Sequence, residues 1–198
     1  MEKAMGKIMT AAAETRAVAG TMTNFRWKIA FLIFLISFVA YMDRVNLSVA
    51  TPVIMQDFGF TKIDMGFIQT CFFASYALMQ VPGGILAEKF GMRKTGAFAI
   101  LWWSVFTALT ALAKGKISFA AVRLAFGLGE GPVFPSLGAA TFTWFNKHEK
   151  GKASSSILLG TFFGPVVGPV ATVALMGLFG WHAVFIIFGL VGIALAWV

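Results

Sequence analysis

Six long apolar runs, separated by short segments that hold most of the charges, constrain this chain more than any other feature. The runs cover 27–54, 63–87, 95–113, 117–138, 153–178 and 182–198. Each of the first five has the roughly seventeen residues that a tilted helix needs to cross a hydrocarbon core about 30 Å thick. The runs do not alternate apolar and polar residues as membrane-spanning strands do. The sequence therefore predicts an all-α integral membrane protein with six transmembrane helices in a lipid bilayer.

Composition excludes the other broad classes. Hydrophobic residues make up 59% of the chain and charged residues 12%, so too few polar side chains exist to cover the surface of a soluble globule. Cys71 is the single cysteine, which excludes a disulfide framework. The net charge of +8 does not indicate a nucleic-acid partner, because the basic residues cluster in short loops instead of alternating with aromatic residues.

The distribution of lysine and arginine predicts the orientation. The segments 1–28, 89–94 and 147–152 hold five, three and three basic residues, whereas the loops on the opposite side hold Lys62, Lys114 and Lys116. Positive residues favour the cytoplasmic side, so the N-terminus is predicted to be cytoplasmic. Residues 1–26 are predicted to be a cytoplasmic tail, because they lack the apolar core of a signal peptide.

The sixth run stops while it is still apolar. Residues 183–198 would form a helix of about 24 Å, which is shorter than the hydrocarbon core. The sequence predicts that the chain is a fragment or a truncated product.

Four ionisable residues lie inside apolar runs: Asp43, Arg44, Arg123 and Glu130. Together they would cost on the order of 10 kcal/mol if they faced lipid, so they are predicted to face a protein interior or a wet cavity. Two acids and two bases can form a structural ion-pair network. They can also form a site for a charged solute and a proton.

Helical spacing separates these four side chains. Asp43 and Arg44 are adjacent and point about 100° apart, so each is expected to find a partner on another helix. Arg123 and Glu130 are separated by two turns, or about 10.5 Å, which leaves Arg123 free to grip a ligand carboxylate in a forked hydrogen bond. Glu130 lies between two glycines in apolar surroundings, where a carboxyl group can gain and lose a proton.

Polar side chains on other runs fit the same cavity. Tyr41 shares a helix face with Arg44, three residues later. A stripe of aromatic and amide residues follows one face of the second run, either as ordinary packing or as the lining of the site: Gln69, Phe73, Tyr76 and Gln80. In the fifth run, glycines at 160, 164 and 168 predict a smooth face for close helix contact, with Pro165 and Pro169 as an alternative hinge.

Several motifs, in order, resemble those of known transporters. The segment Gly84–Lys94 resembles the loop between helices two and three of the major facilitator superfamily, a gating loop in which Gly84, Glu88, Gly91, Arg93 and Lys94 match the pattern. Glu88 stands where aspartate is usual. The segments 41–50, 123–135 and 144–153 resemble helix one, helix four and the following loop of the anion:cation symporter family.

This resemblance covers 27–198 and implies the N-terminal half of a twelve-helix transporter whose C-terminal six-helix half is absent from the chain. It implies uptake of a small organic anion, such as a sugar acid, an aromatic carboxylate or a dicarboxylate, with protons across the bacterial inner membrane. The implied substrate-binding residues are Arg44, Arg123, Tyr41, Tyr76, Gln80 and Thr161. The implied proton-coupling residues are Asp43 and Glu130. Leu158 and Thr161 replace the Asn and Gln of many sugar-acid members, which leaves fewer partners for substrate hydroxyls.

Other functions stay open to different degrees. An exchanger of organic or phosphorylated anions and a half-protein without transport activity are the alternatives. A membrane enzyme is not expected, because His148 and His182 have no ligand partners at short spacing and no nucleophile–base pair is visible. The sequence holds no cofactor or metal motif, and a proton is the expected coupling ion.

Overall fold

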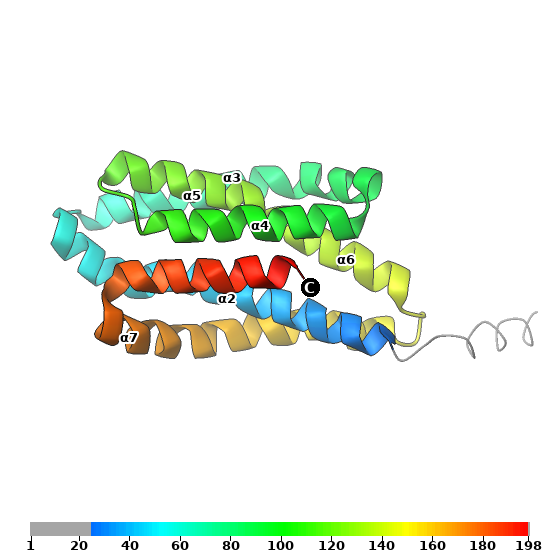
Figure 1. Ribbon diagram of the computed structural model, residues 1–198. Helices are drawn as coiled ribbons and strands as arrows, with labels where there is room; N and C mark the ends of the chain where they lie inside the picture. Colours follow the sequence, from blue (N-terminus) through cyan, green and yellow to red (C-terminus); the bar gives the residue numbers. More distant parts are fainter. Residues whose placement is uncertain (1–24, 198) are drawn as a thin grey trace, which may run out of the picture.

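The computed structural model describes residues 25–197, and this part of the chain is helical throughout, without strands. The helices are α2 (Phe25–Phe58), α3 (Lys62–Phe90), α4 (Met92–Thr110), α5 (Lys116–Glu130), α6 (Val133–Trp144) and α7 (Lys150–Ala196). They run up and down the long axis of one bundle (Figure 1). The predicted tail falls mostly on residues 1–24, which lie outside the described residues, as does Val198. The last two predicted tail residues, 25 and 26, belong to α2.

Four helical segments are long and apolar enough to cross a membrane: α2, α3, the pair α5–α6 (Lys116–Trp144) and α7. At 47 residues α7 would measure about 70 Å if straight, more than twice the thickness of the hydrocarbon core. It is broken at Gly180, where φ is 78° and ψ is 166°, a conformation open almost only to glycine. The chain reverses there, so that the last part of α7 runs back along the bundle (Figure 1).

The predicted fourth run, 117–138, differs from the helix that forms. The chain is helical from Lys116 to Trp144, but the helix is interrupted between Glu130 and Val133. Pro132 lacks the N–H that would continue the hydrogen-bond ladder, which accounts for the break. The break directly after Glu130 was not predicted.

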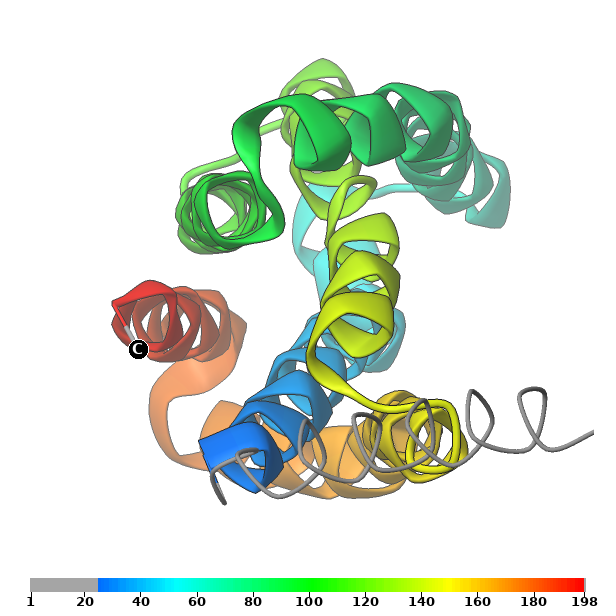
Figure 2. The same ribbon diagram turned by 90° about the vertical axis from the view of Figure 1, so that its right-hand side faces the viewer.

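The helices pack in two groups that α4 joins. α2 packs on α7, α3 packs on α5, and α4 contacts both α5 and α7 (Figure 2). The predicted glycine face of α7 lies against α2. A Cβ atom on Gly160 would come 2.5 Å from the carbonyl oxygen of Phe34, and one on Gly164 would come 2.7 Å from Cβ of Tyr41. The prediction of close helix contact is therefore confirmed.

We expect Gly164→Ala to destabilise the chain by about 1–3 kcal/mol, because the added methyl group overlaps the α2 backbone and side chains. Gly177→Ala is the matched control on the same helix, since a Cβ there meets nothing within 4 Å. Thermal unfolding of the two variants in detergent micelles checks the difference. Equal melting temperatures would contradict the close contact of α2 with α7.

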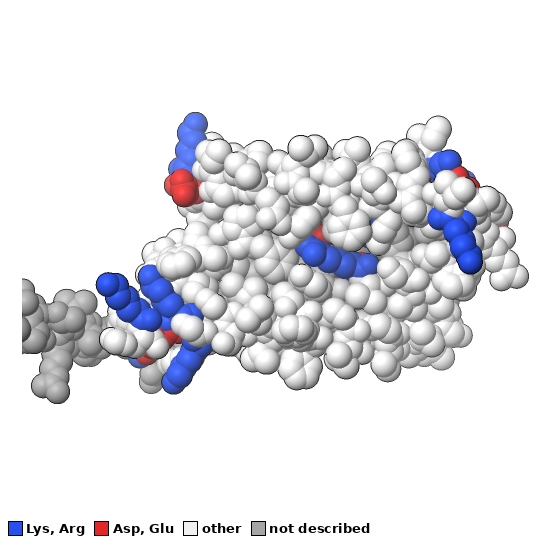
Figure 3. Space-filling model, turned by 180° about the vertical axis from the view of Figure 1, so that it is seen from behind, with Lys and Arg blue, Asp and Glu red and all other residues white. Residues whose placement is uncertain are grey.

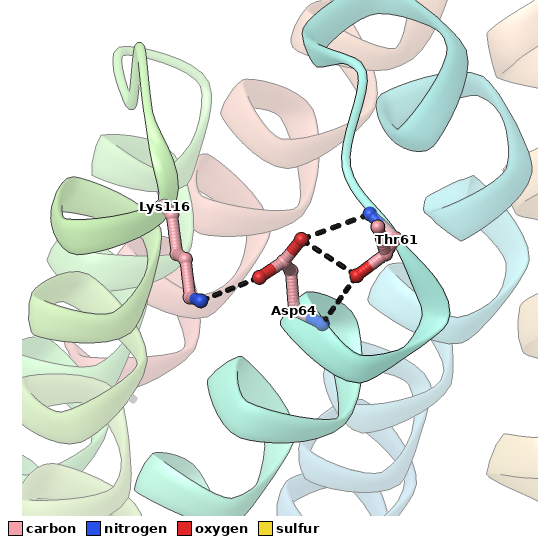
Figure 4. A network of polar contacts seen from close by, with 3 residues as sticks. All are labelled: Thr61, Asp64 and Lys116. Carbon is pink, nitrogen blue, oxygen red and sulfur yellow. Dashed lines mark hydrogen bonds and ion pairs between the residues drawn. The ribbon is translucent and has the colours of Figure 1, made fainter.

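The end of the bundle where α3 begins is held by polar contacts (Figure 4). Asp64 accepts hydrogen bonds from the backbone N–H and the hydroxyl group of Thr61, and its own N–H donates to Thr61 Oγ1, which forms a capping box. Lys116 at the start of α5 pairs with the other oxygen of Asp64. Nearby, Trp181 Nε1 donates to Asp57 Oδ2 at 2.7 Å and ties the turn of α7 to the end of α2.

The predicted gating loop is almost entirely helical. Gly84 and Glu88 belong to α3, whereas Arg93 and Lys94 lie in the first turn of α4. Gly91 alone links the two helices, with φ at 86°. The prediction that this segment is a loop is therefore wrong. One glycine with a positive φ reverses the chain, and no further loop residues are needed.

Candidate functional site

The four ionisable residues predicted to avoid lipid are buried or mostly buried within the bundle. Asp43 is 1% exposed, Arg123 is 2% exposed and Glu130 is fully buried. The Arg44 side chain retains 16% exposure. Asp43 and Arg44 lie near the middle of α2, while Arg123 and Glu130 lie on α5, so the charges meet between these two helices.

Arg44 and Glu130 form an ion pair between α2 and α5. Arg44 Nε donates to Glu130 Oε1 at 2.7 Å, which confirms that Arg44 finds its partner on another helix. Aromatic rings surround the guanidinium, with centroids 4.4–5.7 Å from it: Tyr41, Phe72, Tyr76 and Phe134. These distances permit cation–π attraction between the rings and the guanidinium.

Asp43 also finds its partner on another helix. Trp103 of α4, a fully buried residue, donates its indole Nε1–H to Asp43 Oδ2 at 3.1 Å. Sequence analysis missed Trp103. The sequence feature that could have identified it is a tryptophan in the interior of an apolar run, because a buried indole N–H requires a hydrogen-bond acceptor.

Arg123 makes no ion pair with any residue of the 25–197 segment, although it is buried. Its guanidinium lies over the rings of Phe126 and Phe185, at 5.0 and 5.8 Å. Arg123 and Glu130 do not pair with each other, as their spacing predicted. This arginine is therefore the base in the cluster that has no carboxylate partner.

Four polar atoms of the cluster are buried without a hydrogen-bond partner among the described residues. The donors are Arg44 Nη2 and Arg123 Nε, and the acceptors are Asp43 Oδ1 and Glu130 Oε2. Buried polar atoms are usually paired, so four unpaired atoms at one site require an explanation, of which a bound ligand, water or proton is one kind. Arginine N–H groups suit a carboxylate, and unpaired carboxylate oxygens can take a proton.

The remaining predicted site residues make none of these hydrogen bonds or ion pairs with the charged cluster. Gln80 is half-buried, and Thr161 donates its hydroxyl to the carbonyl oxygen of Leu158 on its own helix at 2.8 Å. Phe73 is 54% exposed, so the predicted stripe does not face the site along its whole length. Sequence analysis missed a buried contact between α7 and α2, in which Thr172 donates to Asn46 Oδ1 at 2.6 Å.

Charge is distributed unevenly over the surface. Lysine and arginine gather at the two ends of the bundle, and the face between them is mostly uncharged (Figure 3). Basic and acidic atoms also come together near the middle of this face (Figure 3). Such a surface fits a lipid-embedded protein with charged ends in the headgroup regions.

Fold and site define a multi-pass α-helical membrane protein with a buried cluster of two acids and two bases. The profile of the Major Facilitator Superfamily matches residues 33–198, and the chain belongs to this family.

Among its relatives are transporters of small organic anions. The chain is 35% identical over 188 residues to the probable galactarate/D-glucarate transporter GudP of Bacillus subtilis, with 90% of this chain and 40% of that protein covered. It is 34% identical over 168 residues to the D-galactonate transporter of Escherichia coli, with 85% and 39% covered. The chain thus spans about 40% of the length of these relatives. The family and these relatives are transporters and not enzymes, as the sequence predicts.

Solved structures show the same fold. A bacterial homologue of the human lysosomal transporter Spinster, in an inward-facing and unoccupied conformation, superposes with a TM-score of 0.79 at 21% identity. The match covers 88% of this chain and 42% of that chain. In its inward-facing and occupied conformation the TM-score is 0.77.

Proposed function

We propose that this chain is the N-terminal half of a secondary transporter that takes up a small organic anion together with protons. The observation that supports this most directly is the unpaired, buried Arg123 beside the Arg44–Glu130 ion pair. A purely structural network would be expected to satisfy both arginines, because an unpaired buried charge is costly.

Charge balance gives a physical reason for coupling. With both carboxyl groups ionised the cluster is neutral, since two acids face two bases. A bound anion would add a negative charge to a site within the membrane, where one uncompensated charge costs roughly 2.5–3.5 kcal/mol. One proton for each added negative charge restores neutrality. The loaded site can then be enclosed at the lowest cost.

The geometry suggests the order of events. Protonation of Glu130 weakens its hold on Arg44 Nε, and Arg44 then has both Nε and the unpaired Nη2 free for the anion. Arg123 binds the same anion from α5. The rings of Tyr41 and Tyr76 keep the Arg44 guanidinium in place during this exchange of partners. The two halves then rock around the site and open it to the other side.

The proposed substrate is a sugar acid or a similar small carboxylate. The names of the relatives support this class, since they include a transporter of D-galactonate and probable transporters of galactarate and D-glucarate and of sulfoacetate. At positions 158 and 161, leucine and threonine offer few hydrogen-bond partners for the hydroxyl groups of a substrate. Within this class, acids with fewer hydroxyl groups are therefore favoured. Gln80 and Thr161 are proposed as lining residues.

The proposed arrangement has six spans, with a cytoplasmic N-terminus in the bacterial inner membrane. The reversal of α7 at Gly180 supports two spans within that helix, and the 19-residue α4 is about 28 Å long. The basic residues near Gly91 lie at the end of the bundle where α2 begins, which supports the orientation. Reading the source DNA past codon 198 tests whether six further spans follow.

We expect the whole transporter, reconstituted into vesicles, to accumulate radiolabelled D-glucarate, D-galactonate or sulfoacetate when the lumen is alkaline. Collapse of the pH gradient by a protonophore should stop accumulation while counterflow of labelled for unlabelled anion continues. The measurement is the luminal label over time. Accumulation that persists without the gradient would contradict symport and favour the anion exchanger.

A further inference from the structure

We propose that Trp103 is a positioning residue, which binds one oxygen of Asp43 and so assigns the other oxygen, Oδ1, as the atom that takes the coupling proton. This inference rests on the proposed function, because it names the atom of Asp43 that exchanges the proton.

The two oxygens of Asp43 have different environments. Oδ2 accepts the indole Nε1–H of Trp103 at 3.1 Å. Oδ1 is buried and has no hydrogen-bond partner among the described residues. An indole N–H can donate but cannot accept. In a protonated carboxyl group the C=O oxygen accepts a hydrogen bond better than the O–H oxygen, so the contact with Trp103 favours Oδ2 as the C=O oxygen. The proton therefore belongs on Oδ1.

Packing holds the indole in this position. Trp103 is fully buried on α4, between helices that approach closely at glycines. A Cβ on Gly129 of α5 would lie 2.9 Å from the backbone nitrogen of Trp103, and one on Gly192 of α7 would lie 3.6 Å from its Nε1. The close approach of these helices leaves the buried indole little room to turn away from Asp43.

Charged groups around Asp43 come from α2 and α5. Arg123 and Glu130 lie on α5, and Arg44 follows Asp43 on α2 with its own partner in Glu130. The part of α7 after Gly180 that packs on α4 holds no charged side chain between 183 and 197. From α4 the Trp103 N–H donates to Asp43, and the Thr107 hydroxyl group, which also lies beside this carboxyl group, donates to the backbone oxygen of Trp103 at 3.1 Å. An N–H donor binds a carboxylate more strongly than a neutral carboxyl.

The test follows protonation of Asp43 directly. Infrared spectra of the 198-residue chain in lipid vesicles are recorded as a function of pH, and Asp43→Asn identifies the carboxyl band of protonated Asp43. Trp103→Phe removes the N–H and keeps an aromatic ring. Trp102→Phe is the matched control at the adjacent residue, because the Trp102 N–H donates at 2.8 Å to the backbone oxygen of Ala125, not to Asp43.

We expect Trp103→Phe to move the titration midpoint of this band to higher pH by about one unit, a tenfold change in proton affinity, and Trp102→Phe to leave it in place. An unchanged midpoint in Trp103→Phe, or an equal shift in both variants, would overturn the proposal. If Trp103→Phe does not fold, benzothienylalanine at position 103 removes the N–H within the same bicyclic shape and is judged by the same criterion.

Transport provides the second measurement. The pH profile of D-glucarate accumulation by the whole transporter should shift in Trp103→Phe as the infrared midpoint does, while counterflow at saturating substrate is retained. If the infrared shift occurs but the native transporter shows no gradient-driven accumulation, the assignment of Trp103 to Asp43 stands and the symport function fails. If accumulation is native-like and the infrared midpoint does not move, Trp103 has no such role.

Discussion

Arg123→Ala is expected to reduce uptake by the whole transporter at least about 100-fold. A forked contact with a carboxylate supplies two hydrogen bonds to a charged group, each contributing about 1.5–3 kcal/mol, and about 1.4 kcal/mol corresponds to a factor of ten. Arg123 is the base that holds no carboxylate within the described chain, so its loss removes a site for the anion. Initial rates of radiolabelled anion uptake measure the effect.

Arg26→Ala is the matched control for this substitution. Arg26 forms an ion pair with Glu149 at 2.9 Å, and these side chains are 19% and 23% exposed. Uptake by Arg26→Ala should remain within about twofold of native, because this pair is separate from the buried cluster that is proposed to bind the anion. Arg123→Lys tests whether two parallel hydrogen bonds to the anion are needed, because lysine keeps the positive charge but lacks the planar guanidinium that makes them. Native uptake in Arg123→Ala would refute the role of Arg123 in substrate binding.

Glu130→Gln is expected to separate exchange from accumulation. The amide resembles the protonated carboxyl in shape and charge, so Arg44 is released and the anion can bind and exchange. The amide cannot give up a proton, so a pH gradient can no longer drive accumulation through this residue. We expect counterflow near the native rate and a steady-state accumulation ratio close to one, measured in the same vesicles.

Glu149→Gln is the control for this change, because it also removes a glutamate from an ion pair with an arginine, outside the buried cluster. Its accumulation ratio should remain native. Should Glu130→Gln still concentrate the anion as the native protein does, Glu130 would not be the proton carrier. A loss of both activities would indicate instead that the Arg44–Glu130 pair holds α2 against α5.

These variants also distinguish the two interpretations of the buried charges that the sequence left open. The ion pair of Arg44 with Glu130 is what a structural ion-pair network would contain. The unpaired atoms on Arg123, Asp43 and Glu130 are not accounted for by it. A structural network predicts loss of thermal stability with each substitution. A transport site predicts stable variants with altered transport.

Much of the fold could be predicted from local sequence. Long apolar runs form helices in lipid because every backbone N–H and C=O must be satisfied within the segment. The same physics placed Asp43, Arg44, Arg123 and Glu130 in the interior, since exposure to lipid is costly. The glycines at 160 and 164 lie at helical spacing, which sufficed to predict a close contact.

Predictions from the local sequence were wrong at two places where a single residue changes the course of the backbone. The motif from Gly84 to Lys94 has the polar composition of a loop, yet Gly91 alone forms the link. Glu130 lies within an apolar run, but the helix breaks directly after it, before Pro132. Hydropathy averages over many residues, so it locates a run and does not resolve a break of two residues.

The sequence by itself determined that these residues form buried membrane helices with two acids and two bases inside. Only the tertiary structure decided which groups pair. Arg44 meets Glu130 across 86 positions, and Asp43 meets Trp103 across 60, while Arg123 is left without a carboxylate. Such contacts depend on how the helices cross and approach each other, which glycines on α5 and α7 set through the space they leave. Glycine spacing along one helix predicts that another helix comes close, but it does not specify which residues of that helix lie opposite.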